Sequence, residues 1–271
     1  MEGGIVLLKL GIDAGGTLIK LAYEEKGCLH VKTYKYNEIA TLIQWLNMLA
    51  PEATLLGTGG KWPELAAKLK QKQQTTDEFT ALINGTRYLL EIEGTPEREF
   101  ILTSIGTGTS IFHVRENNFE RILGSGIGGG TFMGLGSLLT KTNQFQDLVE
   151  LASLGNRQNS DLLVKDIYGS VEAPLFGDLT AANFGKAHSH TEKTEADHAA
   201  ALNQLITEII LSLAGQVAAA KNIQHIVFAG STLQGNQPLR ESIASFQEML
   251  QFTPVFLEKG AYAGAIGALY A

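Results

Sequence analysis

The chain has 271 residues, 44% of them hydrophobic and 18% charged, which is enough for a substantial core and for two halves of about 100–150 residues each. Its formal net charge of −7 argues against a nucleic-acid-binding protein, because such proteins present a basic face. The single cysteine, Cys28, excludes an internal disulfide and a cysteine-built zinc or iron–sulfur centre within one chain.

The first half of the sequence predicts three strands and then helices around one further, buried strand. The strands are indicated by apolar and polar residues that alternate between tight turns, and the helices by apolar positions repeated at helical spacing. In chain order, we expect strands at Ile5–Ile12, Thr17–Glu24 and Leu29–Tyr36, a helix capped by Asn37 that runs to about Ala50, a strand at Thr54–Gly57, and helices at Pro63–Lys72 and Phe79–Glu91.

The second half repeats this order. Expected in turn are strands at Phe100–Ile105, Thr109–Val114 and Phe119–Leu123, a helical region opened by Gly124–Gly130, a long apolar helix at Ala196–Lys221, a buried strand at Ile226–Ala229, a further helix, a strand at Val255–Leu257 and a helix at Ala261–Ala271. The order β-β-β-α-β-α therefore occurs about twice, and we predict two α/β lobes, residues 1–97 and 98–271.

A glycine-rich turn joins the first two expected strands. Gly15 and Gly16 have no Cβ, so the backbone there can take positive φ and approach a phosphate closely. Thr17 adds a hydroxyl donor and Lys20 a positive charge, while Asp13 brings a carboxylate that repels phosphate unless a cation such as Mg²⁺ lies between them. The turn predicts a site for nucleotide phosphates with magnesium, although an ordinary tight hairpin with a solvated aspartate contains the same residue types.

A second glycine-rich turn, Gly106-Thr107-Gly108, lies between the first two expected strands of the second half. Two such hairpins in matching contexts suggest a duplicated fold that holds one nucleotide from two sides. Neither turn is a P-loop, because that motif ends in Gly-Lys-Ser/Thr and opens a helix, whereas Thr17–Glu24 alternates as a strand does.

The sequence also bears on the protein's location. The opening Met1–Ile12 lacks the basic flank and cleavage site of a signal peptide. Glu208 interrupts the longest apolar run before it reaches the length that spans a membrane. We therefore expect a cytoplasmic protein that binds neither membrane nor nucleic acid.

The order of elements and the two hairpins resemble the sugar kinase/Hsp70/actin superfamily, and in detail the type II pantothenate kinases of the bacterial, staphylococcal kind. The match runs nearly end to end, and its most specific stretches are Gly11–Lys20, Gly106–Ser110, Gly128–Gly130, Gly177–Gly185 and Glu258–Leu269. The resemblance implies an α/β fold of two actin-like (ribonuclease H-like) lobes, each a mixed sheet flanked by helices, with an ATP cleft between them. It also implies ATP-dependent phosphorylation of pantothenate, the first step towards coenzyme A, in a homodimer.

By position, the resemblance implies a role for several residues. Glu78 is implied as the general base, Asp13 as the residue beside Mg²⁺, and Arg121 and Ala181 as the residues that bind pantothenate, Arg121 through its carboxylate. The implied nucleotide contacts are Asp13, Ala14, Gly15, Gly16, Thr17, Leu18, Ile19, Lys20, Thr107, Gly129, Gly130, Thr131, Phe132, Met133, Phe145 and Ser231.

Simpler interpretations remain open for these features. Without the resemblance, Glu78 is more readily an acid that favours a helix start, and Arg121 a residue on a strand surface. The helix Ala196–Lys221 is expected to form the dimer interface, but it fits the core of one lobe equally well. Alternative functions are another small-molecule kinase, such as an N-acetylhexosamine kinase, and a non-catalytic nucleotide-binding regulator. The bacterial sugar kinases of that kind often carry a cysteine-rich zinc motif, which one cysteine cannot supply.

Overall fold

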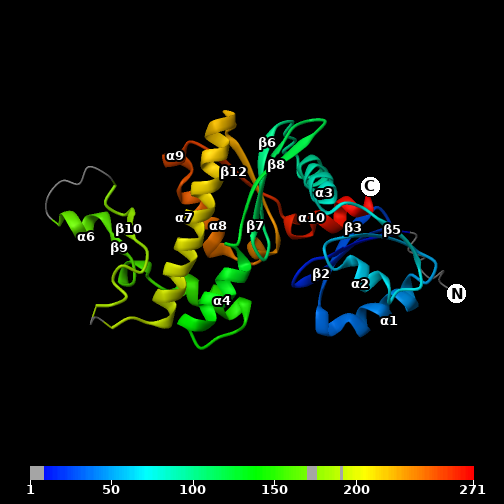
Figure 1. The fold of residues 1–271 in the computed structure, drawn as a ribbon, viewed down its shortest axis with the longest axis horizontal. Coiled ribbons are helices and arrows are strands. Elements are labelled where there is room, and N and C mark those ends of the chain that lie inside the picture. Colours follow the sequence, from blue (N-terminus) through cyan, green and yellow to red (C-terminus); the bar gives the residue numbers. More distant parts are fainter. Residues whose placement is uncertain (1–8, 170–175, 190–191) are drawn as a thin grey trace.

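The computed structural model describes residues 9–169, 176–189 and 192–271, and residues 5–8 of the expected first strand lie outside this range. Two five-stranded mixed sheets form its frame (Figure 1). The first sheet has the order β3-β2-β1-β4-β5, with the bounds β1 Lys9–Ala14, β2 Leu18–Glu25, β3 Cys28–Lys35, β4 Thr54–Thr58 and β5 Lys72–Thr75. Its helices are α1 (Ile39–Leu49), α2 (Trp62–Ala66) and α3 (Glu78–Ile92).

The second sheet has the same topology as the first. Its order is β8-β7-β6-β11-β12, with the bounds β6 Phe100–Ile105, β7 Thr109–Val114, β8 Phe119–Ser125, β11 His225–Ala229 and β12 Thr253–Phe256. In each sheet three antiparallel strands are followed by two strands parallel to the first. The duplicated α/β order expected from the sequence is therefore confirmed.

The remaining elements belong to the second half of the chain. They are the helices α4 (Gly129–Leu139), α5 (Phe145–Leu154), α6 (Val164–Tyr168), α7 (Glu195–Lys221), α8 (Gln237–Ser245), α9 (Gln247–Leu250) and α10 (Ala263–Leu269), and a small pair of strands, β9 (Leu162–Leu163) and β10 (Thr180–Ala182).

Helices and sheets alternate in five layers. Side chains alternate across each strand, so Leu10 and Ile12 of β1 pack on α1 and α2, whereas Ile101 and Ile105 of β6 pack in the core shared with α7. The two sheets meet in a third core, built on α3 and α10, which lie between them (Figure 1). The C-terminal helix α10 thus packs directly against α3 and against β1, β2 and β4 of the first sheet, although it ends the second half of the chain.

Glycines allow α10 to approach its neighbours closely. A Cβ at Gly85 of α3 would lie 1.8 Å from the carbonyl oxygen of Ala263, and one at Gly267 would lie 1.7 Å from that of Ala81. A Cβ on Gly11 of β1 would lie 1.9 Å from the carbonyl oxygen of Ala265. Because real Cβ atoms do not come this close, these positions accept only glycine unless the backbones move apart.

The long helix α7 is mainly a core helix. Its buried residues extend from Asp197 to Ala218, and it packs against α4, α5 and α8. This finding favours the core alternative over the expected dimer interface. Although Glu208 interrupts its apolar run, α7 is long and apolar enough to cross a membrane by length and composition alone, yet 56% of its most apolar stretch is buried within the fold.

Two local predictions in the first half were wrong. The helix expected from Asn37 begins instead with a short 3₁₀ turn, Tyr36–Glu38, and Asn37 does not cap α1. The helix expected over Pro63–Lys72 ends at Ala66, and Lys72–Thr75 adds an edge strand parallel to β4. The polar run in β5 has no apolar alternation to mark a strand, but Gln73 donates to the carbonyl oxygens of Ala66 and Leu69 and thereby ends the helical segment.

Candidate active site

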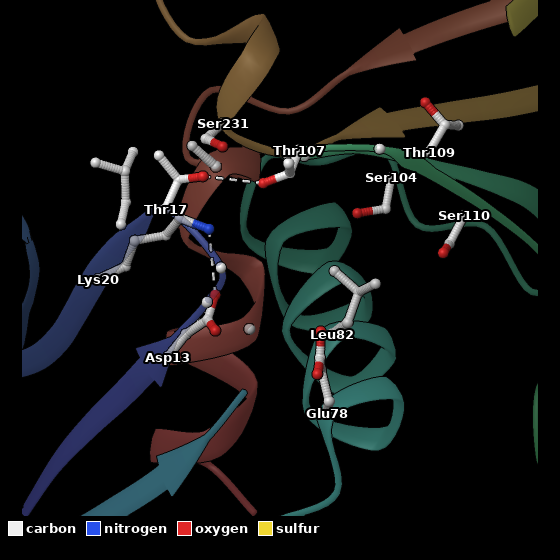
Figure 2. A pocket seen from close by; sticks show the side chains of 18 of the residues that line it. Asp13, Thr17, Lys20, Glu78, Leu82, Ser104, Thr107, Thr109, Ser110 and Ser231 are labelled. Atoms are coloured by element: carbon white, nitrogen blue, oxygen red, sulfur yellow. Dashed lines mark hydrogen bonds and ion pairs between the residues drawn. The ribbon is translucent and has the colours of Figure 1, made fainter. Parts of the chain in front are cut away.

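A cleft of about 650 Å³ lies where the tips of the two glycine-rich hairpins face each other (Figure 2). Its floor and walls come from the ends of strands in both sheets and from the start of α3. The predicted site residues that line it are Asp13, Gly15, Gly16, Thr17, Leu18, Lys20, Glu78, Thr107, Arg121 and Ser231. The structure therefore brings together most polar residues that the sequence analysis selected, from four separate parts of the chain.

The first hairpin fixes Asp13 and Lys20 beside each other. They are antiparallel partners on β1 and β2, so their side chains leave the same face of the sheet. Lys20 Nζ lies 3.2 Å from Asp13 Oδ2, and each side chain is 14% exposed. In α10, Gly264 lies against Asp13, where a Cβ would come within 2.9 Å of Oδ2. The cleft thus contains a partly buried ion pair whose charges remain accessible to a ligand.

The second hairpin is held from behind by the start of α4. The amides of Gly129 and Gly130 donate to the carbonyl oxygens of Gly106 and Thr107, each at 2.8 Å. Because these donors are already used, the two glycines shape the hairpin rather than face the cleft, and the cleft-lining residues do not include them. At the tip, the hydroxyl oxygens of Thr107 and Thr17 lie 3.1 Å apart, so the two hairpins touch across the cleft (Figure 2).

Glu78 occupies the wall opposite Asp13, at the first turn of α3 (Figure 2). Asp77 caps this helix by accepting a hydrogen bond from the amide of Thr80 at 2.9 Å. Loss of solvation in the cleft raises the pKa of the Glu78 carboxyl above its ordinary value, and the negative charges of Asp13 and Asp77 raise it further, while Lys20 opposes them. A carboxylate in this environment holds a proton more readily than an exposed glutamate does.

Arg121 lies on β8 with its guanidinium at the mouth of the cleft. Its Nη2 donates to the Ser110 hydroxyl at 3.3 Å, and its Cζ lies 5.6 Å from the ring centroid of Phe79. Gly124 leaves the room for this placement, because a Cβ there would lie 2.0 Å from Nη2. Since Phe79 directly follows Glu78, the start of α3 places the candidate base and a potential carboxylate-binding cation in one neighbourhood.

The cleft residues fit a magnesium ion held mainly through a nucleotide. Among the described residues, no three His, Cys, Asp or Glu side chains form a metal-binding group. However, Mg²⁺ in phosphoryl-transfer sites is commonly held by one or two carboxylates together with phosphate oxygens and water. Asp13 supplies such a carboxylate, and the buried hydroxyl of Thr58, which also lines the cleft, has no hydrogen-bond partner within the described part of the chain.

Several predicted nucleotide contacts lie behind the cleft instead of in its wall. Ala14 and Ile19 are fully buried in the core beneath the first hairpin. Phe132, Met133 and Phe145 pack in the core on the outer face of the second sheet. The hydroxyl of Thr131 donates to the carbonyl oxygen of Gly126 at 2.8 Å. These positions support the cleft, and their contact with nucleotide stays a prediction.

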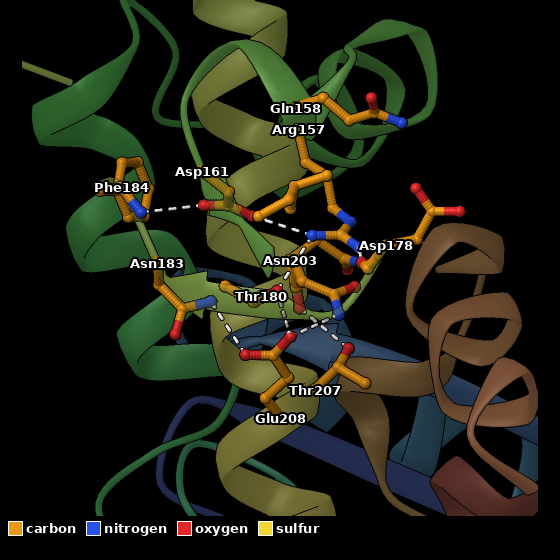
Figure 3. A network of polar contacts seen from close by, with 12 residues as sticks. Arg157, Gln158, Asp161, Asp178, Thr180, Asn183, Phe184, Asn203, Thr207 and Glu208 are labelled. Carbon is orange, nitrogen blue, oxygen red and sulfur yellow. Dashed lines mark hydrogen bonds and ion pairs between the residues drawn. The ribbon is translucent and has the colours of Figure 1, made fainter. Parts of the chain in front are cut away.

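Ala181 lies outside this cleft, on β10, and its role as a substrate contact likewise stays a prediction. The segment that carries it is fixed to the middle of α7 by Glu208 (Figure 3). This carboxylate accepts from the Thr180 hydroxyl at 2.6 Å and from the Asn183 amide at 3.0 Å, while Arg157 donates to the same Thr180 hydroxyl at 3.0 Å. The charge that interrupts the apolar run of α7 therefore anchors a surface segment.

Sequence analysis missed some residues of the cleft. Thr58 is the last residue of β4, and Gly230 directly follows the corresponding strand β11, so an alignment of the two halves could have pointed to this strand end. Leu82 lies one helical turn beyond Glu78 and shares its face of α3. Gly260 and Gly264 reach the cleft only because α10 folds back between the sheets, and no local pattern in the sequence predicts that packing.

Sequence comparisons give a consistent family assignment. A family model described as Fumble matches residues 25–271. A protein named type II pantothenate kinase from Oceanobacillus iheyensis is 45% identical over 262 residues, which cover 96% of this chain and 98% of that protein. A protein of the same name from Bacillus anthracis is 40% identical over 264 residues, with 96% of each chain covered.

Solved structures with similar folds have much lower sequence identity. Component A of the (R)-2-hydroxyglutaryl-CoA dehydratase of Acidaminococcus fermentans has a TM-score of 0.64 at 18% identity and covers 98% of both chains. A ROK family glucokinase from Streptomyces griseus, solved with glucose and AMPPNP, has a TM-score of 0.55 at 13% identity and covers 97% of this chain and 98% of its own. At such identities the likeness supports the fold alone, and it confirms the predicted actin-like α/β class.

Proposed function

This chain belongs to the type II pantothenate kinase family, and on that premise we propose that it transfers the γ-phosphoryl group of ATP to the primary hydroxyl of pantothenate. The observation that carries the proposal is the convergence of Lys20, Glu78 and Arg121 on one cleft between two glycine-rich hairpins. Together they offer a cation for phosphate, a carboxylate base and a cation for the substrate's carboxylate.

The geometry supports separate roles for the cleft residues in this reaction. The hairpins and Lys20 hold the phosphates, and Arg121 binds the carboxylate of pantothenate at the other end of the cleft. The hydroxyl oxygen of pantothenate attacks the γ-phosphorus, the bond from that phosphorus to ADP breaks, and the hydroxyl proton passes to Glu78. Bound beside Asp13, Mg²⁺ would supply positive charge for the phosphate oxygens.

The raised pKa of Glu78 suits this role. Burial is the main cause of that rise, and a base of intermediate basicity accepts a proton from an alcohol more effectively than an ordinary exposed carboxylate does. An acid that merely favours the start of α3 has no need of a cleft position. The opposite walls occupied by Asp13 and Glu78 leave space between them for the reacting groups (Figure 2).

A turnover assay with a panel of acceptors tests the proposal. We expect ATP consumption with pantothenate, lost when Mg²⁺ is chelated, and none with N-acetylglucosamine, N-acetylmannosamine or glucose. Turnover with a sugar and none with pantothenate would favour the alternative of an N-acetylhexosamine or related kinase. Tight ATP binding without turnover on any acceptor would favour a non-catalytic regulator.

The cellular setting is also part of the proposal. A net charge of −7 and the bacterial relatives support an enzyme of the cytoplasm that binds neither nucleic acid nor membrane. By analogy with the family, we propose that the working form is a homodimer.

A further inference from the structure

The carbonyl oxygen of Gly15, at the tip of the first hairpin, is bound from behind by Tyr36. The phenolic hydroxyl donates to this oxygen at 2.5 Å. Tyr36 reaches it because β3 ends beside the hairpin, where Lys35 pairs with Leu18, and the chain then enters the 3₁₀ turn that begins at Tyr36. Tyr36 does not line the cleft, so this contact lies on the far side of the hairpin from the proposed phosphates.

The same peptide group carries the amide of Gly16. In a trans peptide the N–H points opposite to the C=O, so a carbonyl of Gly15 directed at Tyr36 directs the N–H of Gly16 away from it, and Gly16 does line the cleft. No hydrogen bond joins this N–H to another described residue. A hydrogen bond to the carbonyl also polarises the peptide, and this makes its N–H a better donor.

Neighbouring groups hold Tyr36 and the hairpin in this arrangement. The ammonium of Lys61 lies 4.1 Å from the centroid of the Tyr36 ring, and the amide of Lys61 donates to the carbonyl oxygen of Ala14 at 3.0 Å. Gly59, at φ +93, allows this loop to come close, because a Cβ there would lie 2.5 Å from the Ala14 oxygen. Burial, with Asp13 and Glu64, raises the pKa of Tyr36 to about 12, so its hydroxyl keeps its proton.

We propose that Tyr36 is a positioning residue for nucleotide binding, which holds the Gly15–Gly16 peptide so that the Gly16 N–H faces the phosphates. The proposal rests on the proposed kinase function, since it assigns the first hairpin to the nucleotide. It predicts an effect on nucleotide affinity that is separate from the effect on pantothenate, because Arg121 lies on β8 and is held by Ser110 and Phe79 rather than by Tyr36 or the first hairpin.

The test compares two tyrosine-to-phenylalanine variants of the full chain. Tyr36→Phe removes the hydroxyl that binds Gly15, while the matched control Tyr88→Phe removes a hydroxyl that is hydrogen-bonded to Tyr270 at 3.1 Å, outside the cleft. We expect Tyr36→Phe to weaken magnesium–AMPPNP binding in calorimetry, and to raise the KM for ATP, by about tenfold. The KM for pantothenate and the melting temperature should stay near wild type, and Tyr88→Phe should bind nucleotide as wild type does.

A second variant and three contrary outcomes keep the proposal falsifiable. Lys61→Met leaves the hydroxyl in place but removes the cation above the ring, and it should weaken nucleotide binding by about twofold to fivefold. Wild-type nucleotide affinity in Tyr36→Phe would overturn the inference, as would an equal loss in Tyr88→Phe or equal rises in both KM values. A wild-type protein that binds no nucleotide at all would instead overturn the proposed function.

Discussion

Arg121 is held at the mouth of the cleft by the hydroxyl of Ser110 and the ring of Phe79, and both contacts leave its guanidinium accessible to a carboxylate. If it binds the carboxylate of pantothenate, Arg121→Ala should raise the KM for pantothenate at least about tenfold, because a charge-assisted hydrogen bond contributes about 1.5–3 kcal/mol. The KM for ATP should change little. Steady-state kinetics with each substrate varied in turn measures this, and equal rises in both values would assign Arg121 a structural or nucleotide role.

The raised pKa of Glu78 predicts the acid side of the pH profile. A base must be deprotonated to act, so kcat/KM should fall as the pH drops through a pKa that lies above the ordinary 4.5 of a glutamate. Burial is the main cause of the rise, and the charge of Asp77 contributes. Asp77→Asn removes that charge but keeps a side chain that caps helices well, so its acid limb should move to lower pH.

Comparing the two pH profiles in one buffer series measures that shift. If the acid limb of kcat/KM in the Asp77→Asn variant stays in place or moves to higher pH, this contradicts the proposed coupling between the carboxylates of Asp77 and Glu78. A melting curve of the same variant shows whether α3 keeps its cap.

The surroundings of two glycines, Gly85 at the crossing of α3 and α10 and Gly134 on α4, predict opposite effects when each is replaced by alanine. In Gly85→Ala the new Cβ would lie 1.8 Å from the Ala263 oxygen, so the free energy of unfolding should fall by about 1–3 kcal/mol or more, the usual cost of overpacking. In the control Gly134→Ala, on the exposed face of α4, the Cβ meets nothing within 4 Å, and the better helix former should stabilise by about 1 kcal/mol.

Urea unfolding of the two variants beside the wild type measures both changes. Destabilisation by Gly134→Ala, or an unchanged free energy of unfolding in Gly85→Ala, would contradict the packing described around these two glycines.

Elements with a strong local pattern could be predicted from the sequence. Both three-strand runs and α7 were found because alternation and apolar helical spacing mark them. The strand β5 was missed because its pairing with β4, rather than its own polar residues, determines its conformation. Likewise, Thr180 and Asn183 are held by the long-range polar contacts of Glu208 and Arg157, which leave no periodic signal in the sequence.

For the site, the glycine-rich turns identified both hairpins, while the roles of Glu78 and Arg121 came from the family resemblance. Neither residue has a local pattern that separates it from a helix-start acid or a strand-surface arginine. Only the folded chain shows that both residues face the same cleft. Tyr36 was missed because its contact with Gly15 depends on the course of the chain after β3.

At the scale of the whole molecule, exposed apolar side chains beside α7 offer a surface for the proposed dimer. Phe176 is 76% exposed and Met249 41% exposed, and both line a second cavity that also borders α7. Light scattering at micromolar concentration should give twice the chain mass of 29.2 kDa. Replacing both residues with aspartate should give a monomer, because charge in an apolar interface is costly.

A wild-type monomer would contradict the proposed homodimer. A double variant that remains dimeric would exclude this surface as the interface and leave the other exposed apolar positions as candidates, among them Leu138 of α4. Neither result bears on the chemistry assigned to the cleft.

The most direct test of the whole account is the product formed by wild type and by Glu78→Gln. The amide keeps the size of the side chain but cannot take the proton, and a general base typically contributes about a hundredfold to ten-thousandfold. With ATP, Mg²⁺ and pantothenate, mass spectrometry should detect singly phosphorylated pantothenate from the wild type. Glu78→Gln should form it slower by about that factor while binding ATP normally. A folded Glu78→Gln protein that forms this product at the wild-type rate, or a wild type that leaves pantothenate unchanged, would contradict the account.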